Sequence, residues 1–130
     1  MDKITERFLK YISFDTKSNP QNGENEKPSS KGQWDLANEL KKELEDLGLE
    51  VSINDECFLF SEIKSNTDKD LPKVGFISHI DTSPEMPGKV DNPQIINYKG
   101  GDIKLNEERS ITVKDLSLIH ISEPTRPRLI

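Results

Sequence analysis

The spacing of apolar residues predicts a helix near the start of the chain, over residues 3–13. One apolar stripe runs along it at helical spacing and consists of Ile4, Phe8, Tyr11 and Ile12. Asp2 stands directly before this stretch, where its carboxylate can accept hydrogen bonds from the first backbone N–H groups of the helix. We expect the apolar stripe to pack on a sheet.

A second, longer helix follows a polar loop and is predicted to end at Leu47. Ser29 or Ser30 can cap its start, and Gly48 can end it in a left-handed conformation. Its apolar residues recur every three or four positions and therefore share one face: Trp34, Ala37, Leu40, Leu44 and Leu47. Charged residues occupy other positions, which is the ordinary pattern of a solvated helix face.

Three stretches after the second helix have the pattern of β-strands. Residues 49–53 alternate apolar and polar side chains, which predicts a half-buried strand, and residues 58–63 predict a second one. Residues 74–80 are apolar on both faces, which predicts a strand that is covered on both sides. Cys57 lies between the first two strands and is expected to fill a small space in the core.

The later part of the chain predicts less regular structure. Residues 98–102 contain two consecutive glycines and predict a turn, and residues 111–113 predict a short strand. The order of elements is therefore helix, helix and then three strands, which is typical of the opening of a mixed α/β domain.

The composition is that of an acidic protein with a thin core. Hydrophobic residues make up 32% of the 130 residues, and this fraction stays low after the 7 glycines are added. The formal net charge of -6 argues against nucleic acid as a partner. The sequence shows neither the apolar region of a signal peptide nor a run of about 20 apolar residues. We therefore expect a cytoplasmic protein that does not cross a membrane, and its single cysteine excludes an internal disulfide.

The third predicted strand ends in polar residues that carry candidate chemistry. His79 and Asp81 are two positions apart, so their side chains point to the same side of a strand. They would lie at its C-terminal end, where open α/β sheets bind ligands. An imidazole is a common zinc ligand, and a neighbouring carboxylate can orient it and raise its basicity. From this spacing alone, a purely structural hydrogen bond between the two side chains is the commoner explanation.

The wider sequence contains further motifs around this pair. They are Glu-Arg-Phe-Leu at 6–9, Gly-Gln-Trp at 32–34, His-Ile-Asp-Thr at 79–82, Ser-Pro at 83–84, Asn-Pro-Gln-Ile at 92–95 and Gly-Gly-Asp-Ile at 100–103. Together they resemble the peptidase T family of tripeptide aminopeptidases, which belongs to the di-zinc exopeptidases. The resemblance runs from the first residue to about residue 103. The His-x-Asp-Thr motif is shared by the whole superfamily, whereas the motifs at 83–84, 92–95 and 100–103 are specific to peptidase T.

The resemblance implies an α/β fold: the N-terminal part of a zinc-exopeptidase catalytic domain, with a mixed sheet flanked by helices, here truncated. It implies two Zn²⁺ ions in each intact subunit, with His79 as a ligand of one of them. Asp81 corresponds to the active-site carboxylate that orients this imidazole and does not bind metal. The resemblance also places residues 15–18 near the active-site side. In the family the turn around Cys57 often carries a glycine, so Cys57 is a small departure from the family pattern.

The remaining metal ligands and the general base come later in sequences of the family and have no counterpart that can be assigned in this chain. The intact protein is therefore expected to release the N-terminal residue from tripeptides, and the chain by itself is expected to be inactive. Two alternatives stay open. One is a related zinc exopeptidase or deacylase with the same His-x-Asp motif, and the other is a non-catalytic α/β interaction domain.

The last residues differ from the rest of the chain. Residues 116–126 resemble the in-frame translation of a DNA adapter that is used in transposase-based sequencing libraries. We therefore expect residues 1–115 to be a fragment of the catalytic domain and residues 116–130 to be a non-native tail. The alternative is a divergent C-terminal segment with a short strand over 118–121. His120 lies in this tail, which leaves His79 as the candidate functional histidine.

Deleting residues 116–130 should leave the melting temperature of the chain nearly unchanged. A segment that was never selected to fit the domain makes few specific contacts, and Pro124 and Pro127 oppose regular structure within it. Thermal unfolding of the 1–115 and 1–130 chains, measured side by side, checks this. A clear loss of stability in the shorter chain would mean that the tail packs as native structure.

Overall fold

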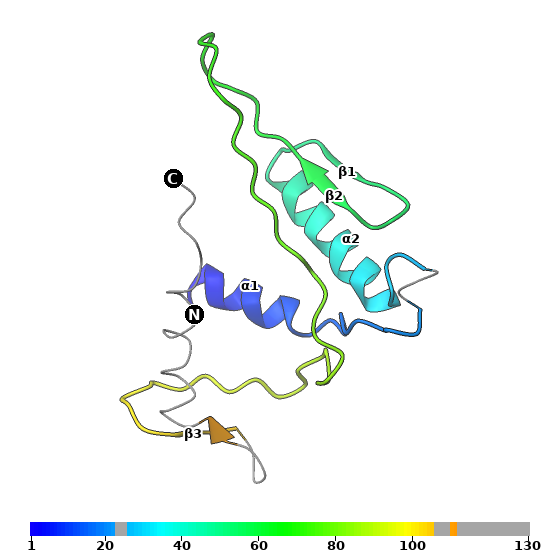
Figure 1. Cartoon of the computed structure of the whole chain (residues 1–130). Coiled ribbons are helices and arrows are strands. Elements are labelled where there is room, and N and C mark those ends of the chain that lie inside the picture. Colours follow the sequence, from blue (N-terminus) through cyan, green and yellow to red (C-terminus); the bar gives the residue numbers. More distant parts are fainter. Residues whose placement is uncertain (23–25, 106–109, 112–130) are drawn as a thin grey trace, which may run out of the picture. The chain divides into compact units, whose positions relative to one another are not determined.

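The computed structural model describes residues 1–22, 26–105 and 110–111, and the chain divides into two compact units, Met1–Pro93 and Gln94–Ile130. Among these residues, the first unit has two helices and two strands, and the second has a pair of short strands. Figure 1 labels the helices and the strands β1 to β3. The chain is thus part of an α/β domain. Within the described ranges, no helix is long and apolar enough to cross a membrane. The predicted tail, including its alternative strand over 118–121, lies outside the described residues.

Helix α1 (Lys3–Tyr11) begins as its sequence predicts. The Oδ1 atom of Asp2 accepts hydrogen bonds from the backbone N–H groups of Ile4, at 3.0 Å, and Thr5, at 2.9 Å. These bonds satisfy two of the N–H groups that have no partner within the first turn of a helix. The helix ends at Tyr11, two residues before the predicted end, because Ile12 already serves as its C-cap.

The prediction that α1 packs its apolar stripe on a sheet is wrong. Ile4 and Phe8 are 81% and 60% exposed. Polar contacts instead join α1 to helix α2 (Lys31–Asp46), and they converge on Glu43. Its carboxylate accepts a hydrogen bond of 2.6 Å from the hydroxyl of Tyr11 and another of 2.9 Å from Lys10. The apolar stripe of α1 does not pack on a sheet, because the strands of this unit pack on α2.

Helix α2 has the predicted position, and one of the two predicted residues is its N-cap, although the expected capping bond is not made. Ser30 occupies the N-cap position without making a side-chain capping bond. The hydroxyl of the neighbouring Ser29 instead accepts hydrogen bonds from the backbone N–H of Asn19, at 3.0 Å, and from Nε2 of Gln33, at 3.3 Å. At the other end Gly48 adopts a φ of 82°, the left-handed conformation that ends a helix.

The buried face of α2 is only partly the predicted one. Ala37 is completely buried as predicted, whereas Leu47, just beyond the helix, is exposed. Gln33 and Leu36 are buried although neither belongs to the predicted stripe. The reason is that α2 packs on the strands along its length and on the segment 15–18 at its first turn. The contact with the segment 15–18 buries Gln33, and a pattern of apolar residues cannot predict the burial of a polar one.

Strands β1 (Val51–Ile53) and β2 (Leu59–Ser61) form an antiparallel hairpin, with Val51 opposite Ser61. Both lie within the predicted stretches and are shorter. The turn between them holds Cys57, which is buried as predicted and has a φ of 67°. Glycine adopts this left-handed conformation more easily than cysteine does.

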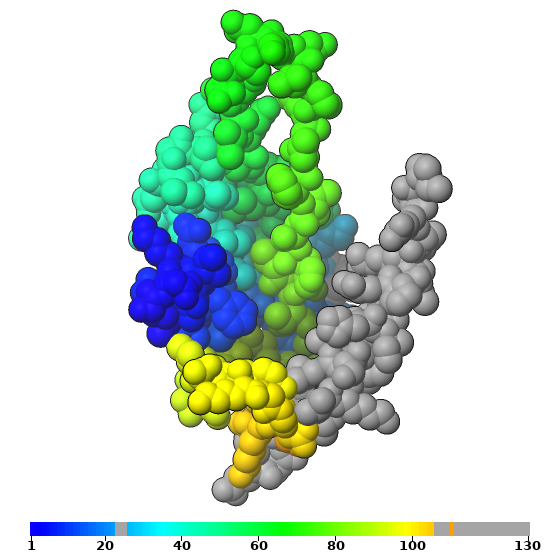
Figure 2. Space-filling model, turned by 90° about the vertical axis from the view of Figure 1, so that its left-hand side faces the viewer, coloured from blue at the N-terminus to red at the C-terminus, as the bar shows by residue number. Residues whose placement is uncertain are grey.

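The prediction of a strand over 74–80 is wrong for the described chain. Phe76 and Ile77 are 96% and 99% exposed, and no strand among the described residues pairs with this segment. In Figures 1 and 2 it belongs to the long green excursion that leaves β2 and returns past α2. A strand exists only when a neighbour accepts and donates its backbone hydrogen bonds, and a strand apolar on both faces also needs a covering layer on each. Residues 1–105, as far as they are described, supply neither for 74–80.

The segment that follows α1 is held at a buried junction. Thr16 is buried, and its carbonyl oxygen accepts two hydrogen bonds: one of 3.1 Å from the backbone N–H of Thr82 and one of 3.3 Å from Nε2 of Gln33. Ser18 continues the pairing, because its backbone N–H donates to the carbonyl of Thr82 at 3.0 Å. Lys17 and Thr82 therefore form a single parallel bridge between segments far apart in the chain.

The second unit contains strands β3 (Ile103–Lys104) and β4 (Ser110–Ile111), paired antiparallel with Ile103 opposite Ile111. The predicted turn before β3 is confirmed, since Gly100 and Gly101 have φ values of 97° and 90°. The hydroxyl of Tyr98 donates to the carbonyl of Gly101 at 2.9 Å and closes this turn. The predicted strand over 111–113 is confirmed at its first residue, and the other two lie outside the described residues.

Gly32→Ala should destabilise the chain by about 1–3 kcal/mol. A Cβ atom at Gly32 would overlap the backbone carbonyl of Asp15, and a backbone atom cannot rotate away as a side chain does. Alanine favours a helix over glycine by about 1 kcal/mol, so the substitution would stabilise α2 if this clash were absent. Urea unfolding followed by the fluorescence of Trp34, the one tryptophan, measures the difference. Asn38→Ala, at an exposed position of the same helix, is the control and should cost nothing.

Glu43→Gln should lower the free energy of unfolding by about 1 kcal/mol or more at neutral pH. The hydrogen bond from Tyr11, followed by that from Lys10, lowers the pKa of the Glu43 carboxyl. Its stabilising effect is therefore present above the ordinary glutamate pKa of about 4.3 and is lost as the pH falls through the lowered pKa. The stability difference between the two proteins should shrink below about pH 4. Glu45→Gln, at an exposed position, should show little difference at any pH, and an equal effect of both substitutions would contradict the prediction.

Candidate functional site

His79 and Asp81 lie together, as their spacing predicts, although no strand carries them. The Nδ1 atom of His79 is 3.1 Å from Oδ1 of Asp81 and 2.8 Å from the backbone carbonyl oxygen of the same residue. A carbonyl oxygen can only accept a hydrogen bond, so Nδ1 must carry the proton. In the neutral imidazole Nε2 then keeps its lone pair. The side chain of His79 is 84% exposed, which leaves this nitrogen accessible.

The carboxylate of Asp81 is held from two sides. Its Oδ1 atom faces His79, and its Oδ2 atom accepts a hydrogen bond of 2.6 Å from the hydroxyl of Ser18. The bond from Ser18 has the larger effect on the pKa of the Asp81 carboxyl and lowers it, and the bond from His79 lowers it further, against the opposing effect of partial burial. Asp81 is therefore a carboxylate at neutral pH.

The parallel bridge between Lys17 and Thr82 places these side chains. Ser18 follows Lys17 by one residue, and Asp81 precedes Thr82 by one residue. The backbone hydrogen bonds on either side of the bridge fix the two segments. The short side chains of Ser18 and Asp81 can therefore reach each other directly. A further contact of 3.4 Å joins the hydroxyl groups of Thr16 and Thr82. Local sequence near His79 does not encode this arrangement, because Ser18 and Asp81 are 63 positions apart.

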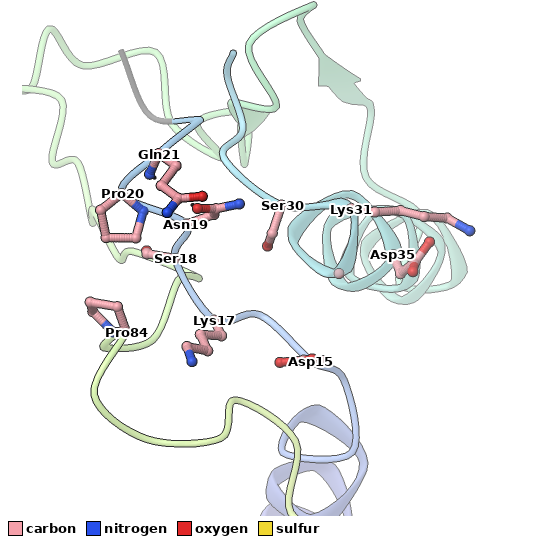
Figure 3. Close-up of a pocket in the computed structure, with 11 residues that line it drawn as sticks. Asp15, Lys17, Ser18, Asn19, Pro20, Gln21, Ser30, Lys31, Asp35 and Pro84 are labelled. Atoms are coloured by element: carbon pink, nitrogen blue, oxygen red, sulfur yellow. Dashed lines mark hydrogen bonds between the residues drawn. The ribbon is translucent and has the colours of Figure 1, made fainter. Parts of the chain in front are cut away.

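A hollow of about 840 Å³ lies beside Ser18. Figure 3 shows Lys17 and Ser18 on one side of it and Ser30, Lys31 and Asp35 at the start of helix α2 on another. Further residues from the same segments and from the loop after Thr82 complete its lining: Asp15, Asn19, Pro20, Gln21, Gly32 and Pro84. Two lysines and two aspartates are among the lining residues, so the formal charges of the lining balance.

The described residues provide one candidate metal ligand at this site. No group of three His, Cys, Asp or Glu side chains among them could hold a metal ion. Both oxygens of Asp81 already accept hydrogen bonds, and Nε2 of His79, on a side chain that is 84% exposed, is the accessible atom that suits a metal. A catalytic zinc ion normally has three protein ligands and one open position. The described site therefore accounts for one ligand and its orienting carboxylate.

The residue pattern identifies His79 and Asp81 but not the groups that fix them. Ser18 and Thr16 are polar residues without a motif of their own, and Gln33 belongs to a motif that does not indicate its contact. All three make contacts between distant segments. The one signal for them is the family resemblance, which places residues 15–18 near the active-site side. The contact between Ser18 and Asp81 agrees with that placement.

Curated proteins named peptidase T are similar to most of this chain, although no protein-family model matches it. Peptidase T of Clostridium novyi (strain NT) is 45% identical over 116 residues, which are 88% of this chain and 28% of that protein. Those of Salmonella newport (strain SL254) and Salmonella enteritidis PT4 (strain P125109) are each 48% identical over 107 residues, 81% of this chain and 26% of theirs. The chain is homologous to part of peptidase T.

The match with peptidase T concerns one part of a longer protein. The chain spans about a quarter of the length of the curated relatives it matches. About three quarters of the length of these relatives therefore has no counterpart in this chain.

Proposed function

We propose that this chain is the N-terminal part of a zinc-dependent tripeptide aminopeptidase. The observation that carries the proposal is the contact between His79 and Asp81, which fixes the proton on Nδ1, in a chain 45% identical to a peptidase T. An imidazole held in this way by a carboxylate is the usual state of a zinc-ligating histidine. The substrate class follows the family: short peptides with a free N-terminus.

The two residues of the site would have different roles. His79 would bind one zinc ion through Nε2, and Asp81 would orient the imidazole and raise its basicity without binding metal. The two occupied oxygens of Asp81 support this orienting role. When bound, a pair of zinc ions supplies polarisation of the peptide carbonyl and activation of water near neutral pH.

The chain by itself should hydrolyse no tripeptide and bind zinc weakly. One imidazole cannot replace the three protein ligands of a catalytic zinc ion. We infer that the missing ligands and the general base belong to the part of peptidase T that has no counterpart here. Two further points stay predictions. One is that residues 1–115 are a catalytic fragment and residues 116–130 a non-native tail, and the other is the cytoplasmic location.

Two other functions are distinguishable by experiment. A zinc exopeptidase or deacylase of a related family would use the same pair of residues, but the relatives at 45–48% identity are named peptidase T. A non-catalytic interaction domain would keep the fold and need no metal. A chimera that joins residues 1–105 to the complementary part of the Salmonella newport peptidase T separates these cases. Its hydrolysis of tripeptides, compared with N-acyl amino acids, and its zinc content give a different result for each.

In this chimera, His79→Ala should remove zinc and abolish tripeptide hydrolysis, because it deletes a metal ligand. Asp81→Ala should retain much of the metal and lower activity by about 10–100-fold, because partners of a ligand tune it without holding the ion. Zinc content by elemental analysis and the rate of release of the N-terminal residue measure both effects. Asp68→Ala, at an exposed aspartate, is the control and should change neither. Full activity in the His79→Ala protein would refute the assignment.

A further inference from the structure

We propose that Ser18 is a positioning residue of the His79 site. Its hydroxyl fixes the carboxylate of Asp81, and this carboxylate, together with the backbone carbonyl of Asp81, holds His79 with the proton on Nδ1 and the lone pair on Nε2. The inference rests on the proposed function in one respect only, namely that His79 binds metal. The placement of the imidazole by Ser18 is a property of the chain itself.

The geometry assigns one donor to each oxygen of Asp81. The hydroxyl of Ser18 is 2.6 Å from Oδ2, and Nδ1 of His79 is 3.1 Å from Oδ1. A carboxylate accepts and does not donate, so both partners must donate their protons to it. The bond from Ser18 to one oxygen restricts the rotation of the carboxylate, and its other oxygen faces the imidazole.

Ser18 can perform this role because its own position is set by the backbone. Its N–H group donates to the carbonyl of Thr82 at 3.0 Å, and the N–H of Thr82 donates to the carbonyl of Thr16 at 3.1 Å. Thr16 is buried and is also bonded to Gln33 of helix α2. The hydroxyl of Ser18 therefore reaches Asp81 from a rigid segment, with a single side-chain torsion left to adjust.

Asp81 needs such a partner because its side chain is half exposed. Without the bond from Ser18, the carboxylate can rotate towards water, and His79 keeps only the backbone carbonyl of Asp81, 2.8 Å from Nδ1. Because this bond to the backbone carbonyl remains, the loss of Ser18 should have only a partial effect on the orientation of His79. Loss of Ser18 should weaken the orientation of His79 without abolishing it, and a change of about tenfold is expected, at the lower end of the range for such partners.

The test compares Ser18→Thr with Ser18→Val, because these two side chains have nearly the same shape and differ in the hydroxyl. Ser18 is only half buried and lines the hollow, which leaves room for the added methyl group. Ser18→Ala is the third variant. Ser13→Ala is the control, because the Ser13 hydroxyl bonds the carbonyl of Lys10 and does not contact the site.

The first measurement is nitrogen NMR of the imidazole in the metal-free 130-residue chain, at a pH of about 8, where histidine is neutral. The His79→Gln spectrum distinguishes the signals of His79 from those of His120. The wild-type chain, Ser18→Thr and Ser13→Ala should carry the His79 proton mainly on Nδ1. Ser18→Val and Ser18→Ala should show a larger fraction on Nε2. Equal fractions in Ser18→Thr and Ser18→Val would overturn the inference.

The second measurement uses the chimera and titrates it with zinc. Ser18→Val should weaken zinc binding and lower kcat by about tenfold with KM little changed, and Ser18→Thr should restore both. If His79→Ala leaves zinc and activity intact, the proposed function fails whatever Ser18 does. If His79→Ala removes both while Ser18→Val and Ser18→Thr behave alike, the proposed function stands and the role of Ser18 is refuted.

Discussion

The carbonyl oxygen of Thr16 accepts two hydrogen bonds in a buried position, and through them it joins three segments that are far apart in the chain. One donor is the backbone of Thr82, and the other is the side chain of Gln33 on α2. Leaving a buried carbonyl without hydrogen-bond partners costs about 1–3 kcal/mol. Losing these bonds would therefore open the junction. The site depends on this junction, because Ser18 and Asp81 meet one residue away from the bridged pair Lys17 and Thr82.

The junction also explains why two positions near the segment 15–18 are glycines. A Cβ atom at Gly32 would overlap the carbonyl of Asp15, and one at Gly88 would overlap Asp15 and Lys17. Both glycines allow another part of the chain to approach closely. This is a common role of a glycine whose φ lies in the range that other residues also adopt. Helix α2 can therefore start against the segment that carries Ser18, and the loop after Thr82 can pass on its other side.

Electrostatic contacts, rather than a buried apolar face, connect the two helices. Glu43 accepts hydrogen bonds from Tyr11 and Lys10, and Arg7 forms an ion pair with it at 3.3 Å. Exposed ion pairs contribute little individually because water screens them. Glu43 is the exception here, since its side chain is 17% exposed and has several partners. Helix α1 is thus held mainly by Glu43, with a further contact between Lys10 and Glu39, while Ile4 and Phe8 of its apolar stripe stay exposed.

The sequence by itself determined the features that depend on neighbours within one turn or one strand repeat. Asp2 caps α1, Gly48 ends α2, and His79 meets Asp81, because each involves groups at most three positions apart. Family resemblance added the expected roles of the last two. These features follow from local geometry, in which the spacing of residues fixes which side chains can touch.

Only the tertiary structure decided how distant segments are paired. It left residues 74–80 exposed, because an apolar strand needs a partner edge and two covering layers that local sequence cannot provide. It turned α1 towards Glu43, and it brought Ser18 to Asp81 across 63 positions. The physical reason is that a contact between distant residues forms only where the backbone of both is held in place, which local spacing cannot specify. For Ser18 and Asp81, the buried carbonyl of Thr16 helps to hold the two segments together.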